Sequence, residues 1–185
     1  MRFKGNIHRT TDSGFAAGLD VRLPTGDEMD LAGTGTAGLQ PFAIWSARFN
    51  RVSPHVNAGY QWNGSSVLGG DPGTGISDDL PDVGTYSAGA VVAIHPRVTA
   101  AVDLIGRYVI DSSRLQAEDF HALDGHSVFP NITFTSSSFN ELSAAAGVKI
   151  NLFGRLLLDL NLLMPLDDAG LRDKLSPLIG IEYAF

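Results

Sequence analysis

Apolar and polar residues alternate along much of the chain, in segments as long as a β-strand. In residues 15–23 the apolar residues Phe15, Leu19 and Leu23 fall at odd positions, and Asp20 and Arg22 lie between them. A period of two places such sets on opposite faces of a strand. The alternation recurs in residues 40–50, 53–63, 84–94, 97–109, 140–152, 154–164 and 175–185. The pattern therefore predicts eight strands, each with one apolar face.

The N-terminal residues alternate in the same way. Phe3, Gly5 and Ile7 fall between the polar residues of 2–8, and the polar and glycine residues of 10–14 are typical of a tight turn. Residues 1–9 are thus a possible ninth strand.

The connections between the predicted strands alternate in length. Residues 24–39, 64–83, 110–138 and 165–174 form longer connections, whereas residues 50–53, 95–96 and 152–154 form short ones. This alternation places the longer loops at one rim and the tight turns at the other, as in outer-membrane barrels. We therefore expect an all-β fold, an antiparallel up-and-down transmembrane β-barrel, with the longer loops outside the cell. A soluble lipocalin-like carrier, whose apolar face points inward, is the alternative.

The chain ends on an aromatic residue that closes the last alternating segment, 175–185. This ending resembles the closing strand of bacterial outer-membrane barrels. The resemblance implies that the barrel assembly machinery recognises the strand that ends at Phe185, and that outer-membrane lipid surrounds the protein.

A second resemblance rests on the stretch Leu23-Pro24-Thr25-Gly26-Asp27, which is followed by Leu31-Ala32-Gly33-Thr34-Gly35, and on the segment 52–60 with its Asn57-Ala58-Gly59-Tyr60 ending. These residues resemble the outer-membrane transporters grouped as the MetA-pathway of phenol degradation family. The resemblance implies uptake of small apolar or aromatic molecules. It supplies no catalytic residues.

Composition narrows the classes of partner. The net charge of −7 argues against nucleic acid. The absence of cysteine excludes disulfides and cysteine-ligated metals. The sequence contains no run of 18 apolar residues, so it predicts no membrane-spanning helix.

The N-terminus shows no apolar signal segment. We expect residues 1–185 to be a single barrel domain without its signal peptide. It is either an eight-stranded barrel that starts at residue 14 or a fragment of a larger barrel. Because complete bacterial barrels have an even number of strands, a ninth strand favours the fragment.

Charged residues of both signs share the predicted polar faces and are our candidates for the lumen lining: Asp20, Arg22, Asp103, Arg107, Glu141, Lys149, Arg155, Asp159 and Glu182. They either brace the interior of a small barrel or line a polar pore. We expect a channel or transporter. A non-conducting structural or adhesive barrel remains open.

No site for catalysis, a cofactor or a metal is predicted. His126 and Ser127 are adjacent in sequence, and neighbours in an extended segment point apart, so they make a poor nucleophile and base pair. The acidic residues of 71–82 do not match the ligand pattern of a calcium loop. We therefore expect no enzyme.

Overall fold

The computed structural model describes all residues except 31, 72, 124–125, 169–171 and 184–185. Leu31, in the glycine-rich motif, and the terminal Phe185 therefore lie outside the described residues. The described residues form only strands and their connections, so the expected all-β class is confirmed. Among them, no helix is long and apolar enough to cross a membrane.

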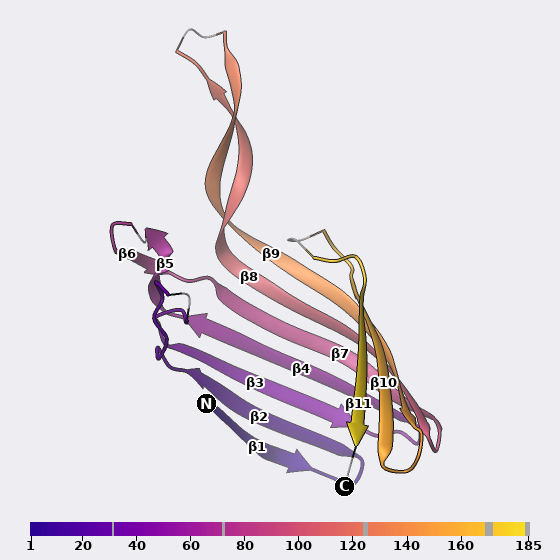
Figure 1. Cartoon of the computed structure of the whole chain (residues 1–185). Coiled ribbons are helices and arrows are strands. Elements are labelled where there is room, and N and C mark those ends of the chain that lie inside the picture. The colour runs from indigo at the N-terminus through magenta and orange to yellow at the C-terminus, as the bar shows by residue number, and fades with distance from the viewer. Residues whose placement is uncertain (31, 72, 124–125, 169–171, 184–185) are drawn as a thin grey trace.

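Nine strands form one antiparallel sheet in which each strand pairs with its neighbours along the chain (Figure 1). They are β1 (Arg2–Arg9), β2 (Ser13–Arg22), β3 (Gly38–Ala47), β4 (Val52–Asn63), β7 (Asp82–His95), β8 (Val98–His121), β9 (Val128–Asn151), β10 (Leu156–Pro165) and β11 (Ser176–Tyr183). Residues 1–9 thus form a ninth strand. The sheet is curved but open, since no ladder joins β1 to β11 within the described part of the chain.

The two edge strands of this open sheet run in the same direction, because eight successive antiparallel pairings separate β1 from β11. Direct pairing of the edges would therefore be parallel. An all-antiparallel closure needs an odd number of further strands between them.

The predicted alternation of connections is present. Short turns join β1 to β2, β3 to β4, β7 to β8 and β9 to β10, and longer connections lie at the other rim. We call these the turn rim and the loop rim. The loop rim is more ordered than the sequence predicted. A small sheet of β5 (Ser65–Asp71) and β6 (Ile76–Asp79) lies within 64–83, and most of 110–138, predicted as a loop, extends β8 and β9 as a hairpin.

The described residues of the motif at 23–35 form a compact connection rather than a strand extension. Asp27 accepts hydrogen bonds from the backbone N–H groups of Met29 and Asp30, and its own carbonyl accepts one from Ala32. A Cβ on Gly26 would lie 2.2 Å from the Ala32 carbonyl oxygen, so this close approach requires glycine. The strand before it ends at Arg22.

The sheet has no closed hydrophobic core. The buried apolar residues are Ala16, Ala47 and Val109, and no large side chain in the described residues is fully buried. Most apolar side chains of the sheet instead point to one exposed face.

Candidate functional site on the polar face of the sheet

The ladder registers divide the sheet into two faces of opposite character. Arg2, Asp20 and Gln40 are successive cross-strand partners, and so are Arg107 and Glu141. These residues define the polar face. Val56 and Ala88, paired between β4 and β7, and Val102 on β8 belong to the other side, which we call the apolar face.

All the candidate lining residues except Arg155 occupy the polar face. Arg155 was predicted on the polar face of a strand that starts at residue 154. This was wrong, because β10 begins at Leu156 and Arg155 lies in the turn before it, where its N–H donates to the Phe153 carbonyl. Gly154 in this turn has φ of 70°, a conformation that glycine adopts without strain.

The charges of the polar face are paired across neighbouring strands. Arg2 lies 2.5 Å from Asp20, and Arg107 donates to both carboxylate oxygens of Glu141. Lys149 bridges Asp159 at 3.4 Å and Glu182 at 3.2 Å, so it links β9 to both β10 and β11. Arg22 donates to the side-chain carbonyl of Asn63 at 2.6 Å. These pairings tie the strands together and neutralise most of the charge on this wall.

His55 and Asp103 form a further pair that spans an intervening strand. Their Nε2 and Oδ1 atoms are 2.6 Å apart, although β7 lies between β4 and β8. Gly89 of β7 is the cross-strand partner of both residues. A Cβ on Gly89 would lie 2.0 Å from Asp103 Oδ1, so the missing side chain leaves the room for this contact.

The centre of the polar face is neutral. Gln40 donates to Thr85 at 3.3 Å, and Asn57 donates to Ser87 at 2.9 Å. The sequence did not predict that Phe42, Ile44 and Ile105 also lie on this face. The registers place them beside these hydrogen-bonded pairs.

We call this neutral centre of the polar face the central strip. A groove of about 500 Å³ follows it. Its lining includes Phe42, Asn57, Ser87 and Ile105, with Arg2 at one side and Arg172 at the other. Arg172 comes from the connection between β10 and β11, where it forms an ion pair with Asp167. It also donates a hydrogen bond to Ser143 Oγ at 3.2 Å. The hollow side of the sheet is therefore the polar one.

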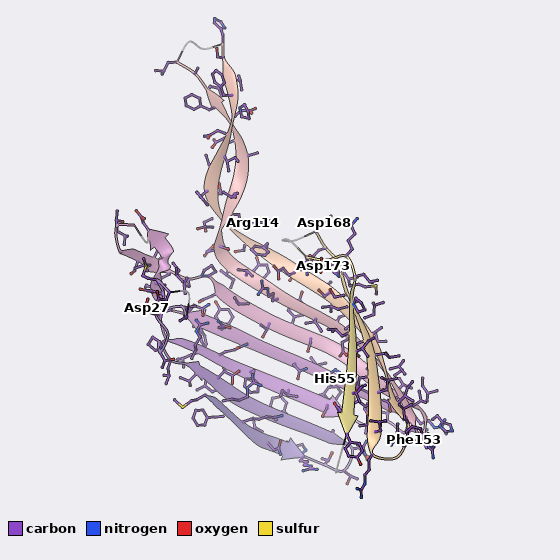
Figure 2. The ribbon with its side chains drawn as sticks, viewed as in Figure 1. Asp27, His55, Arg114, Phe153, Asp168 and Asp173 are labelled. Atoms are coloured by element: carbon purple, nitrogen blue, oxygen red, sulfur yellow. The ribbon has the colours of Figure 1, made fainter. Side chains whose placement is uncertain are left out.

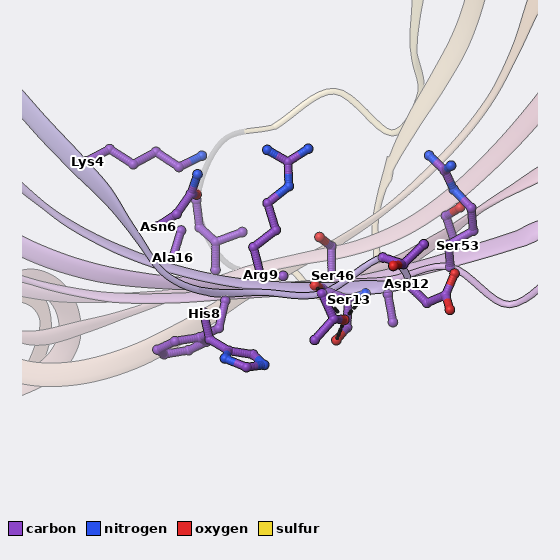
Figure 3. Close-up of a pocket in the computed structure, with 16 residues that line it drawn as sticks. Lys4, Asn6, His8, Arg9, Asp12, Ser13, Ala16, Ser46 and Ser53 are labelled. Carbon is purple, nitrogen blue, oxygen red and sulfur yellow. Dashed lines mark hydrogen bonds between the residues drawn. The ribbon is translucent and has the colours of Figure 1, made fainter.

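A larger hollow of about 850 Å³ lies where β1, β2 and β3 reach the turn rim (Figure 3). Lys4, Asn6 and Arg9 point to the same side in this view, and His8 points to the other. A register shift between Asn6 and His8 explains the difference, because it places His8 opposite Phe15 on the apolar face. The simple alternation of residues 2–8 put His8 on the polar side, and this was wrong.

The two rims carry different side chains (Figure 2). Asp27, Asp168 and Asp173 lie at the loop rim, and Phe153 lies at the turn rim. At the loop rim, Asp71 accepts hydrogen bonds from the Thr74 hydroxyl and the Gly73 N–H, and these bonds lower the pKa of its carboxyl group. No group of three or more His, Asp or Glu residues is placed to hold a metal ion in the part of the chain that the structure describes.

No family model matches the chain, and no curated protein matches it.

Proposed function

We propose that this chain forms the wall of a transmembrane β-barrel in the bacterial outer membrane, which passes small apolar or aromatic molecules. The observation that carries the proposal is the contrast between the two faces. The polar face holds paired charges, whereas the apolar face exposes large side chains across the sheet, among them Val102 at 60%, Ile94 at 56% and Ile181 at 72%. A contiguous apolar surface of this extent marks a membrane or protein contact.

Aromatic residues of the apolar face fall into two groups along the strands. Tyr60 and Trp62 lie toward the loop rim, whereas Phe15 and Trp45 lie toward the turn rim. The outermost aromatic residue at the turn rim is Phe49, which is exposed and is bridged to Val52. Ten residues separate Trp62 from Val52, about 33 Å of strand, which at a tilt of 40° projects to about 25 Å. This matches the height of the apolar band between the aromatic girdles of outer-membrane barrels.

The curvature favours a membrane barrel over a lipocalin-like carrier. A carrier of that kind binds its ligand on an apolar inner face. Here the groove lies on the polar face, and the apolar face is the outer side.

The class of solute that we expect to pass follows from the central strip of the polar face. Its charged neighbours are paired, so the strip presents amide and hydroxyl groups beside Phe42, Ile44 and Ile105 rather than a row of unpaired charges. Such a wall favours uncharged solutes with an apolar part over ions.

The two tryptophans of the chain, Trp45 and Trp62, both lie on the apolar face, which allows a test without substitution. The chain is refolded into vesicles that contain lipids brominated along the acyl chain, and tryptophan fluorescence is recorded. We expect strong quenching of both residues together with a β-rich circular dichroism spectrum. A β-rich chain that stays soluble without detergent and shows no quenching would contradict the membrane assignment.

Transport is tested separately by release of a small neutral aromatic solute from the same vesicles. We expect release that depends on the folded chain, and little passage of a charged analogue. Quenching without release would instead support the non-conducting structural barrel.

A further inference from the structure

Positively charged residues without a carboxylate partner gather in the hollow at the turn rim. Lys4, Arg9 and Arg48 line it, and Asp12 is the single acidic residue among its described lining residues. No ion pair joins any of these three cations to an acidic residue that the structure describes. The hollow therefore carries an excess of positive charge, although the net charge of the whole chain is −7.

The rest of the polar face is different. Arg2, Arg107 and Lys149 each lie within 3.4 Å of a carboxylate oxygen on another strand, and Arg172 is paired with Asp167. Each of these cations is neutralised by a residue of the same chain. The hollow is thus the part of this wall where an anion from outside the chain would balance the charge.

A β-bulge in β1 brings two of the unpaired cations to one face. Asn6 and His8 pair with successive residues of β2, so Ile7 between them is an extra residue. In a strand of strict alternation the odd-numbered Arg9 would lie on the face opposite to Lys4. The bulge changes this, and Arg9 lies on the polar face with Lys4. Bulges at sheet edges commonly re-aim a side chain in this way.

A similar bulge lies in β8, where β8 and β9 extend beyond the sheet. Ile110 and Asp111 of β8 lie there opposite one residue of β9, and Asp111 has φ of 51°. The odd-numbered Leu115 thereby lies on the apolar face, opposite Phe134. Each bulge thus keeps side chains of one chemical kind on one face, which are apolar in β8 and positively charged in β1.

Small residues form the floor of the hollow beside these cations. Arg9 pairs with Gly14, and Gly14 pairs with Ser46 on the next strand. A Cβ on Gly14 would meet only Ser46 Oγ, at 4.0 Å, so the space above this glycine is open. Lys4, Asn6 and Arg9 rise on one side of this floor (Figure 3). The two cations repel one another across this space, and an anion placed between them would remove that repulsion.

We propose that this hollow binds a small oxyanion, the phosphate or carboxylate group of a soluble molecule. Lys4 and Arg9 supply the charge, and the planar guanidinium of Arg9 offers paired N–H donors that match such a group. The Asn6 amide and the Ser46 hydroxyl line the same hollow and add uncharged donors. A volume of about 850 Å³ lies within the range of small-molecule sites. The site lies nearer the turn rim than the central strip, so it goes beyond the proposed passage of uncharged solutes.

Inorganic phosphate tests the site in the full chain, refolded in a neutral detergent and checked for a β-rich spectrum. Binding is measured by isothermal titration calorimetry at constant ionic strength, so that general screening of charge stays equal. We expect saturable binding to the unaltered chain. Arg9→Gln should weaken it about tenfold, which is the loss expected for one hydrogen bond between charged groups. Lys4→Gln should weaken it as well, and it serves as the test if Arg9→Gln does not fold.

Arg51→Gln is the matched control, because it removes the same charge at the turn rim from a residue that does not line the hollow. We expect this variant to bind phosphate as the unaltered chain does. Equal losses in Arg51→Gln and Arg9→Gln, or no saturable binding to the folded unaltered chain, would overturn the inference. Binding that depends on Arg9 only with vesicles of an anionic phospholipid, and not with dissolved phosphate, would assign the site to lipid and overturn it too.

Thermal unfolding gives an independent readout, because a ligand that binds only the folded chain raises the midpoint of unfolding. We expect phosphate to raise the midpoint of the unaltered chain and of Arg51→Gln, and to raise that of Arg9→Gln much less. Equal rises in all three would contradict the proposed site. Phosphate binding does not require contact with lipid, so its failure is distinguishable from a failed membrane assignment, which tryptophan quenching measures.

Discussion

Every interior strand of the nine-stranded sheet has a hydrogen-bonded neighbour on each side. The parts of β8 and β9 that extend beyond the sheet, Ser112–His121 and Val128–Ser137, pair only with each other, and we call this extension the ribbon. At the same loop rim β5 pairs only with β6. The alternation of apolar and polar residues is similar in the sheet and the ribbon. Alternation therefore specifies which face a residue occupies, but not whether anything covers that face. The predictions below separate the two regions, from the largest expected effect to the smallest.

The largest effect is expected from a charge on the apolar face of the sheet. Val102→Arg and Ala101→Arg alter adjacent residues of β8 that lie on opposite faces. In vesicles, we expect Val102→Arg to lower the free energy of unfolding by about 2–4 kcal/mol, as arginine does near the bilayer midplane. Denaturant titration measures it. If the apolar face lay in water, arginine at this exposed position would cost about 0.5 kcal/mol or less, and Val102→Arg would then match Ala101→Arg.

Close packing of Tyr86 over Gly106 predicts a second effect within the sheet. A Cβ at Gly106 would lie 2.2 Å from the Tyr86 ring, whose hydroxyl donates to Asn140 at 2.8 Å. Gly106→Ala must displace this ring, and we expect a loss of about 1–3 kcal/mol in the free energy of unfolding.

Gly84 supplies the matched control on the same ladder, because it faces Tyr108 as Gly106 faces Tyr86. A Cβ at Gly84 would meet Tyr108 at an ordinary 3.8 Å. Gly84→Ala should therefore cost much less than Gly106→Ala in the same titration, and similar losses would contradict this packing argument.

A smaller effect is expected from the ion pairs of Lys149. Asp159 has a side chain 18% exposed, whereas that of Glu182 is 60% exposed. Removing the charge by Asp159→Asn should cost up to about 1 kcal/mol, and Glu182→Gln only a few tenths, because water screens exposed pairs. Unfolding titrations of the two variants measure the difference, and a larger loss for Glu182→Gln would reverse the ranking.

The smallest effect is confined to the loop rim. Hydrogen bonds lower the pKa of Asp71, so their contribution is complete above the pKa of an unfolded Asp and is lost as pH falls through the lowered value. We expect Thr74→Val to raise the Asp71 pKa toward its ordinary value, which NMR titration of the carboxyl carbon measures. Thermal unfolding of the sheet should stay unchanged.

The sequence predicted the sheet well because its strands obey a strict period of two. The positions of Asp20, Arg107 and Glu182 on one face follow from that period alone. Arg155 was misplaced because a turn glycine at Gly154 delays the next strand. Phe42 and Ile44 were missed because both are apolar residues on a polar face, where they interrupt the expected pattern.

Other features depend on distant parts of the chain and could not be predicted. The pair of His55 and Asp103 requires Gly89 between them, and the order of β4, β7 and β8 decides that arrangement. The ribbon was predicted as a loop because the bulge at Asp111 changes the phase of the alternation in β8. The apolar residues before and after the bulge therefore do not fit one continuous pattern.

The bulge at Asp111 also limits how the gene can change in length. A deletion of one codon at Asp111 would remove the extra residue, and the regular pairing that results would keep Leu115 opposite Phe134 and Ala117 opposite Ile132 on the same side. A deletion of one codon farther along β8, with the bulge retained, would instead turn the later residues of this strand toward the other side. Loss of a whole cross-strand pair farther along the hairpin would shorten it without mixing the two sides. Natural length variation in this hairpin should therefore occur in matched steps on both strands, and single-codon losses should be confined to the bulge and the tip.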